Sequence, residues 1–159
     1  MHQNIGRKRS LVSIGTHDLD TVKGPFVYDA QPPKKINFVA LGQEKSHNAA
    51  ELMEIFKDSH LKPYLHLIEG KDKYPVIRDA NGIVMSMPPI INGEHSKITL
   101  NTKNIFIEIT ATDQTKANTT LDIITTLFSY HCKDQFEIEP VDVELADGSV
   151  ITTPLIPYR

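Results

Sequence analysis

The sequence predicts an α+β fold in which a mixed, largely antiparallel sheet packs against helices in a single compact domain. Three observations lead to this prediction. Strand-like and helix-like segments are interspersed along the chain, most neighbouring strands are joined by short turns, and no linker or repeat interrupts the 159 residues. A chain of this length can bury one core without disulfides or metals.

The first third of the chain combines a helical pattern with two short strands. Residues His2–Ile14 have a composition compatible with a helix. They include the basic run Arg7–Arg9, which could contact phosphate or form a solvated helix face, and we favour the solvated face. Gly15–Asp18 is predicted to break the pattern in a turn. Strands are then predicted at Phe26–Asp29 and Lys35–Leu41.

The middle of the chain begins with a helix that has a clear N-terminal capping signal. Asn48 and Glu51 have capping-box spacing and open a helix that runs to about Lys57. The less regular segment Tyr64–Ile68 is compatible with a short helix or a strand, and the helix is favoured. A hairpin follows, with strands at Tyr74–Arg78 and Ile83–Ser86 joined by the turn at Asp79–Gly82.

The last third predicts a strand, a long helix and a terminal strand pair. The strand spans Asn104–Ala111, and Asp113 can cap a helix that ends near Cys132. The strand pair comprises Phe136–Leu145 and Val150–Thr153, with an Asp-Gly turn between the two strands. Met1 leads directly into a helical pattern and no tail follows the last strand, so we expect a domain excised from a longer chain.

Composition excludes several classes of function. The 17 basic and 20 acidic residues give a net charge of -3, so no general attraction to nucleic acid is expected. The single cysteine, Cys132, cannot form an internal disulfide, and no Cys/His pair has zinc-ligand spacing. These features favour a cytoplasmic protein without a metal. Without an apolar run of about 20 residues or a secretory signal, no membrane partner is expected either.

The stretch Ser86–Asp113 contains most of the chemical information. Alternation along its strand places three isoleucines on one face and Phe106, Glu108 and Thr110 on the other. If Glu108 is partly buried, its carboxylate needs a partner, which is either an internal group or a ligand. The internal partner is favoured on the strand pattern alone. Asn92–Gly93 is ambiguous too: it suits an ordinary turn, or a place where a ligand approaches the backbone.

Familiar catalytic arrangements are absent from the sequence. Cys132 follows His131, but adjacent helical residues point about 100° apart and cannot act as nucleophile and base. His17, in the GTHD segment, is interpreted as a local hydrogen-bonding residue in a turn. The chain has no G-x-S-x-G, Walker or dinucleotide-binding motif.

Two long sequence segments resemble a known family. They are RKRSLVSIGTHDLDTVKGPFVY and YPVIRDANGIVMSMPPIINGEHSKITLNTKNIFIEITATD. Together they closely resemble the β subunit of eukaryotic cytosolic phenylalanyl-tRNA synthetases, and the resemblance extends over essentially the whole chain. It implies that residues 1–159 are an editing-domain fragment that hydrolyses tyrosine wrongly attached to the phenylalanine tRNA. The synthetic site, with its ATP and Mg²⁺, would lie in the α subunit.

The resemblance also implies site residues and partners. Ser86, Glu108 and Thr110 match positions associated with recognition of the tyrosine hydroxyl, although Glu108 replaces the Asp of some relatives. Asn92 and Gly93 are expected to form a backbone cradle, and no catalytic side chain, metal or cofactor is assigned to this region. The expected partners are the acceptor end of the tRNA and the α subunit of a heterotetramer, and the isolated fragment is expected to be monomeric. The alternative is a non-catalytic module that positions tRNA or scaffolds the subunits.

Overall fold

The computed structural model describes residues 12–155, and backbone contacts divide them into two compact units. The larger unit is Ile14–Glu108, and the smaller unit contains residues 12–13 and 109–155. Helices and mainly antiparallel strand pairs make up both units, so the predicted α+β class is confirmed. The predicted basic run Arg7–Arg9 and most of the predicted first helix lie outside the described residues.

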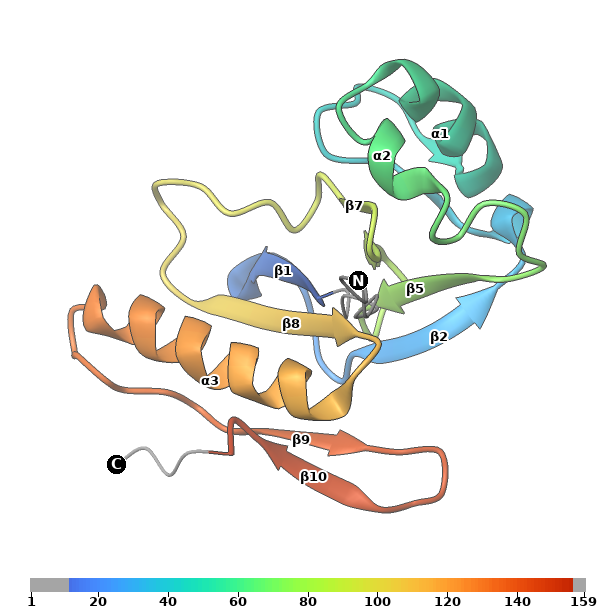
Figure 1. Cartoon of the computed structure of the whole chain (residues 1–159). Coiled ribbons are helices and arrows are strands. Elements are labelled where there is room, and N and C mark those ends of the chain that lie inside the picture. Colours follow the sequence, from blue (N-terminus) through green and yellow to red (C-terminus); the bar gives the residue numbers. More distant parts are fainter. Residues whose placement is uncertain (1–11, 156–159) are drawn as a thin grey trace, which may run out of the picture. The chain divides into compact units, whose positions relative to one another are not determined.

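A four-stranded antiparallel sheet forms the framework of the larger unit (Figure 1). Its strand order is β2 (Val27–Gln31), β5 (Tyr74–Arg78), β6 (Val84–Met87) and β7 (Ile91–Asn92). The β5 strand has the predicted bounds, whereas β2 and β6 begin one residue later than predicted. The β5–β6 turn confirms the predicted hairpin, and its Gly82 adopts a φ of 80°.

Asp79 holds the β5–β6 hairpin closed through backbone hydrogen bonds. Its Oδ1 accepts from the N–H groups of Asn81 at 2.9 Å and Ile83 at 2.8 Å. Its Oδ2 accepts from the Lys23 N–H at 3.3 Å. Burial alone would raise the pKa of Asp79, but these hydrogen bonds together lower that pKa below its usual value.

Helix α1 (Ala49–Ile55) begins at the predicted capping box. Asn48 Oδ1 accepts from the Glu51 N–H at 3.1 Å, and Glu51 Oε2 accepts from the Asn48 N–H at 3.0 Å. A 3-10 helix at Phe56–Asp58 extends the helical region to its predicted end. Helix α2 (Lys62–Leu65) lies beside α1 in Figure 1 and confirms that the following segment is helical, although it ends earlier than predicted.

The core of the larger unit lies between α1 and the sheet. It combines residues from α1, from strands β5 and β6, and from the segment before α1. The predicted strand Lys35–Leu41 contributes to this core but is strand only at β3 (Asn37–Phe38), which pairs with β4 (His47–Asn48). The fully buried apolar side chains are Ile36, Ala40, Ala49, Leu52, Val76, Met85 and Met87.

The first described strand corrects two predictions. Strand β1 (Val12–Asp18) covers the predicted turn at Gly15–Asp18 and the last residues of the predicted helix. Val12, Ile14 and Thr16 are β-branched and recur at every second position, which favours a strand. The pattern was missed because the inward-facing positions carry Gly15 and His17 rather than apolar residues.

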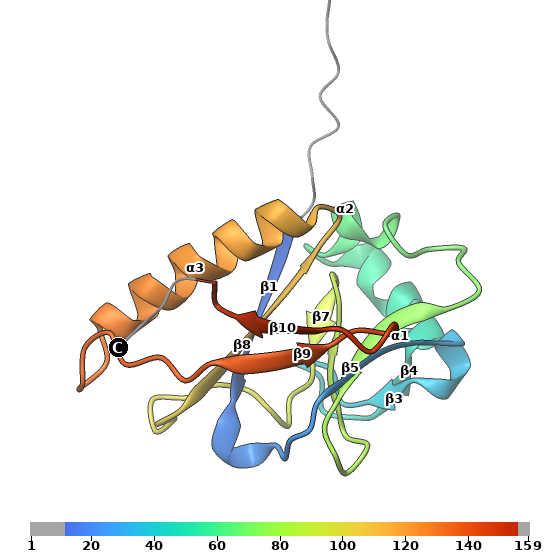
Figure 2. The same ribbon diagram turned by 90° about the horizontal axis from the view of Figure 1, so that it is seen from below.

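Strand β8 (Ile105–Ala111) pairs with β1 in a two-stranded sheet (Figures 1 and 2). Its bounds are as predicted to within one residue. Within the described residues, β8 has β1 as its one strand neighbour. The isoleucine face is also less buried than expected, because Ile105 is 38% exposed.

The smaller unit contains the long helix and the terminal hairpin. Helix α3 (Gln114–Tyr130) starts at the predicted cap, where Asp113 Oδ1 accepts from the Lys116 N–H at 2.9 Å. Strands β9 (Val141–Glu144) and β10 (Val150–Thr153) form the predicted antiparallel pair, seen as a hairpin in Figure 2. The first of these strands is shorter than predicted. Residues Phe136 to Pro140, which were predicted to belong to it, are not strand.

Candidate functional site

Glu108 has a nearly buried carboxylate that lies over a glycine. Its side chain is 9% exposed and belongs to β8, while Gly15 belongs to the paired strand β1. A methyl group added at Gly15 would lie 2.8 Å from Glu108 Cδ and closer still to Oε1. The absence of a side chain at Gly15 therefore makes room for the carboxylate. A carboxylate so little exposed is stable only with polar or charged neighbours.

One titratable neighbour of this carboxylate is His17. The His17 side chain is fully buried, and its Nε2 lies 4.0 Å from Glu108 Oε1. On the other side of the ring, Nδ1 lies 2.8 Å from Ser96 Oγ. Among the described residues, Nε2 has no hydrogen-bond partner. The prediction that His17 bonds locally in a turn is wrong, because it lies in a strand and bonds to a residue 79 positions away.

The two residues after His17 form hydrogen bonds with the loop that leads into β8. The Asp18 N–H donates to the Ser96 carbonyl at 2.9 Å, and Asp18 Oδ2 accepts from Thr102 Oγ1 at 2.6 Å. The Leu19 N–H donates to the Asn104 carbonyl at 2.9 Å, directly before β8 begins. These bonds fix the path of residues 96–104, so the GTHDLDT segment positions the strand that carries Glu108.

An aromatic ring of β8 lies near the imidazole and packs against a second ring. The Phe106 ring centroid lies 6.2 Å from that of His17 and 4.5 Å from that of Phe26. Phe106 is on the same face of β8 as Glu108, as the strand alternation predicts. The imidazole and the carboxylate are both largely shielded from water, so the electrostatic interaction between them is stronger than it would be in water.

Ser86 is the second predicted site residue, and it is buried in β6 with 1% exposure. It faces Asn92 across the β6–β7 pair, and its Oγ donates to Asn92 Oδ1 at 3.0 Å. The hydroxyl hydrogen is thus engaged, whereas the oxygen can still accept a hydrogen bond. The structure brings Ser86 and Asn92 together as a polar pair.

Gly93 does not lie in a turn. The chain reverses between Met87 and Ile91, and Gly93 follows β7 and bridges to Ala40. Its N–H donates to the Met85 carbonyl at 2.7 Å, and a Cβ at this position would lie 2.6 Å from the Val84 carbonyl oxygen. A close approach of two backbone segments therefore explains this glycine, and its N–H is already engaged.

The third predicted residue, Thr110, lies on β8 and is half-buried. It belongs to the smaller unit, which includes the chain from Ile109 onward, whereas Ser86 and Glu108 belong to the larger unit. Sequence reasoning missed Gly15 and His17 as neighbours of Glu108, and Ser96 as the partner of His17. For Gly15 and His17 the sequence offered one indication, which is that residues two positions apart in a strand lie on the same face.

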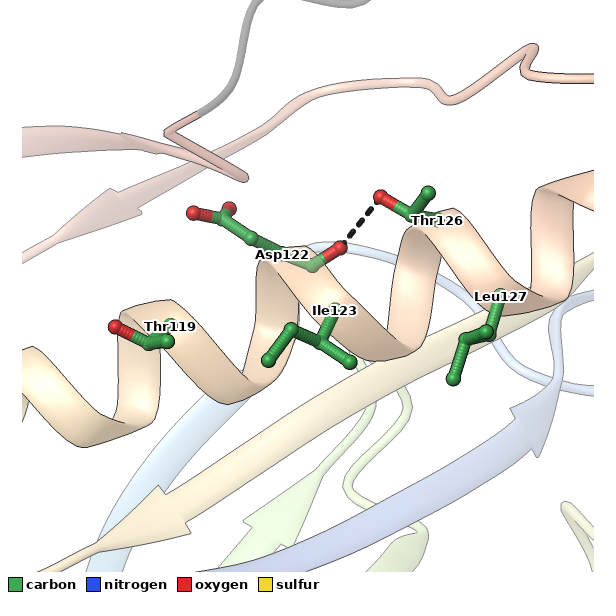
Figure 3. A pocket seen from close by; sticks show the side chains of 5 residues that line it. All are labelled: Thr119, Asp122, Ile123, Thr126 and Leu127. Carbon is green, nitrogen blue, oxygen red and sulfur yellow. Dashed lines mark hydrogen bonds between the residues drawn. The ribbon is translucent and has the colours of Figure 1, made fainter.

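A separate surface hollow of about 350 Å³ lies along α3 (Figure 3). All of its lining side chains come from this one helix, and they are Thr119, Asp122, Ile123, Thr126 and Leu127. Thr126 Oγ1 donates to the Asp122 carbonyl at 2.7 Å, and Asp122 Oδ1 accepts from the Leu155 N–H at 3.0 Å. One helix face with its polar groups engaged in this way is not a built ligand site.

Other chemical arrangements find little support in residues 12–155. The exposed Cys132 donates weakly to the Phe128 carbonyl, with a distance of 3.5 Å. No group of three His, Cys, Asp or Glu residues in this part of the chain is arranged to hold a metal ion. In the same residues, no helix combines the length and apolar character that crossing a membrane requires.

Comparison with known proteins gives a consistent assignment. The B3/4 domain model matches residues 2–133. Phenylalanine–tRNA ligase beta subunits from Mus musculus and Homo sapiens are 61% and 58% identical to this chain over its whole length. The cytoplasmic beta subunit from Arabidopsis thaliana is 57% identical over 97% of it. The chain spans about a quarter of each relative, with values of 27%, 27% and 26%.

A solved structure shows the same fold. It is an N-terminal fragment of the phenylalanyl-tRNA synthetase beta subunit from Pyrococcus horikoshii, with 34% sequence identity and a TM-score of 0.81. The similarity covers 94% of this chain and 41% of that fragment.

Proposed function

The chain belongs to the B3/4 domain family, and we propose that it is the editing region of a phenylalanine–tRNA ligase beta subunit. In this proposal the region hydrolyses tyrosyl-tRNA(Phe) in the cytoplasm. The α subunit of a heterotetramer performs aminoacylation with ATP and Mg²⁺, and this region receives the acceptor end of the tRNA. The isolated region is monomeric.

Physical chemistry explains why such a region is needed. A pocket that selects phenylalanine rejects an analogue with one added hydroxyl by only about a hundredfold. A second site that requires the hydroxyl reverses this preference. If phenylalanine enters that site, a buried polar group is left without its hydrogen bond, at a cost of about 1–3 kcal/mol. Correctly charged tRNA is therefore spared.

The observation that supports the proposal is the nearly buried carboxylate of Glu108. Its side chain is 9% exposed and lies beside the fully buried His17. An ionised carboxylate accepts hydrogen bonds at about four positions, so it can bind a phenolic hydroxyl in addition to its protein neighbours. Ser86 and Thr110 are proposed to complete recognition of the hydroxyl, with Asn92 orienting the Ser86 side chain through their 3.0 Å hydrogen bond.

The proposed reaction uses positioned water rather than a side-chain nucleophile. The water oxygen attacks the ester carbonyl carbon, the bond to the ribose oxygen breaks, and that oxygen takes up a proton as tyrosine leaves. The neighbouring ribose hydroxyl assists by orienting the water. Positioning and stabilisation of the oxyanion are sufficient for an activated ester. Because the Gly93 N–H donates to Met85, the backbone cradle near Asn92 has to supply another donor.

Glu108→Ala in the full-length subunit, assembled with its α partner, tests the proposal. We expect hydrolysis of preformed tyrosyl-tRNA(Phe) to fall by about 10- to 100-fold, the equivalent of one hydrogen bond to a charged group. Phenylalanylation should be unchanged, because the α subunit performs it. Glu108→Gln keeps the shape but removes the charge, and it should lie between the wild type and Glu108→Ala.

A matched control is Glu44→Gln, which changes an exposed glutamate of the same unit. Hydrolysis by this variant should equal that of the wild type. Hydrolysis that persists unchanged in Glu108→Ala would refute the role of Glu108. A wild-type complex that fails to hydrolyse tyrosyl-tRNA(Phe) would instead indicate a non-catalytic module that positions tRNA or the subunits.

A further inference from the structure

The imidazole of His17 has one buried nitrogen for which residues 12–155 offer no hydrogen-bond partner. The ring is fully buried, and Nε2 is the atom without a partner among the described residues. A buried polar atom that nothing compensates destabilises the folded state. Glu108 Oε1 lies 4.0 Å from this nitrogen, which is beyond hydrogen-bond distance but within reach of a small side-chain movement.

Ser96 is the hydrogen-bond partner of the other ring nitrogen of His17. Its Oγ lies 2.8 Å from Nδ1, and both side chains are buried. When the serine hydroxyl donates to Nδ1, the neutral ring carries its hydrogen on Nε2, which faces the carboxylate. The opposite tautomer would direct a lone pair at a carboxylate oxygen. Electrostatics therefore favours a chain of donors from Ser96 through His17 to Glu108.

We propose that His17 is a positioning residue that acts through Glu108, an inference that rests on the proposed function. The Nε2–H group donates to Oε1 when the substrate is bound, and this bond fixes the carboxylate so that it can accept from the phenolic hydroxyl. His17 itself does not contact the substrate. Gly15 fits this arrangement, because it leaves the space in which the carboxylate lies beside the imidazole.

Two features of the structure set His17 apart from an ordinary buried histidine. The Asp18 N–H and the His17 ring both bond to Ser96, so the strand and the side chain are held by the same residue. Phe106 covers the ring on the side of β8. The ring orientation is thus fixed from two directions, and it presents Nε2 to the one carboxylate to which the family resemblance assigns a role.

Two substitutions separate the two nitrogens of the ring. In His17→Asn the carboxamide can reproduce the bond of Nδ1 with Ser96 but cannot reach Glu108. In His17→Gln the carboxamide nitrogen can reach the position of Nε2. The test uses the full-length subunit in complex with its α partner and measures single-turnover hydrolysis of tyrosyl-tRNA(Phe). We expect a loss of about tenfold in His17→Asn and a recovery to within about threefold of wild type in His17→Gln.

A double-mutant cycle with Glu108→Gln distinguishes positioning from a general loss of structure. If His17 acts through Glu108, His17→Asn should reduce hydrolysis little further in the Glu108→Gln background. Ser96→Ala provides a milder change, and it should also lose its effect in that background. Phenylalanylation and the thermal midpoint report folding, and His60→Asn, which changes an exposed histidine, is the matched control.

The outcomes separate this inference from the proposed function. A full tenfold loss that adds to that of Glu108→Gln, or wild-type hydrolysis in His17→Asn, would overturn the positioning role while leaving the editing function intact. Failure of Glu108→Ala to affect hydrolysis would overturn both the positioning role of His17 and the proposed role of Glu108, whereas a wild-type complex that does not hydrolyse tyrosyl-tRNA(Phe) would overturn the editing function. Loss in His17→Asn with recovery in His17→Gln and no additivity supports the inference.

Discussion

Gly15→Ala should move the Glu108 carboxylate without unfolding the protein. The added methyl group would lie 2.8 Å from Glu108 Cδ, whereas ordinary contact begins at 3.4 Å, so Cδ must move by at least the difference of 0.6 Å. The carboxylate oxygens, at the free end of the side chain, move further. Gly15 is not among the glycines with positive φ, so the backbone accepts alanine without strain.

A displacement of about 1 Å at a positioning group can cost a hundredfold in rate. We therefore expect tyrosyl-tRNA(Phe) hydrolysis by the assembled enzyme to fall by about 100-fold in Gly15→Ala, measured in single turnovers with preformed substrate. The thermal midpoint should stay the same or rise, because alanine restricts the unfolded chain more than glycine does.

Gly24→Ala is the matched control for this substitution. A Cβ at Gly24 would have no neighbouring atom within 4 Å, and this glycine also lacks a positive φ. Its hydrolysis rate should equal that of the wild type. Gly15→Ala with hydrolysis within about threefold of wild type would refute the reasoning, since it would mean that the carboxylate position does not matter.

Two further predictions concern stability. Hydrogen bonds lower the folded-state pKa of Asp79. Its contribution to the free energy of unfolding is therefore present at pH values above its usual pKa of 3.8, and it is lost as the pH falls through the lowered pKa. Asp79→Ala should therefore lower the free energy of unfolding, measured with urea, by about 2 kcal/mol at neutral pH and by less under strongly acid conditions. An equal decrease at every pH would contradict this prediction. Asn48→Ala removes one half of a capping box and should lower the free energy of unfolding by about 1 kcal/mol, while Ser46→Ala, at an exposed neighbouring position, should not.

Helices and strands that begin or end at a capping residue or a turn motif were predictable from the sequence. Asn48 and Asp113 each cap a helix with their own side chain, and the Asn-Gly turn in Asp79–Gly82 closes a hairpin with the predicted strands. Each of these signals lies within a few residues of the structure that it determines. For this reason the α+β class followed from the sequence even though several element ends did not.

The surroundings of Glu108 were not predictable in the same way. Alternation in β8 placed the carboxylate on the correct face, but its neighbours come from β1, whose inward positions are Gly15 and His17. Neither residue produces the apolar alternation by which a half-buried strand is recognised. Ser96 lies in a loop whose path depends on hydrogen bonds to Asp18, and no local pattern encodes such distant bonds.

The space above Gly15 also has a consequence for how this sequence can diverge. Positions 15 and 108 occupy one volume, so the residue tolerated at one depends on the residue at the other. A lineage with Asp at position 108 has a shorter side chain and gains room for alanine at position 15. A lineage with Glu does not. We therefore expect the two positions to vary together among homologues, with Glu108 accompanied by glycine.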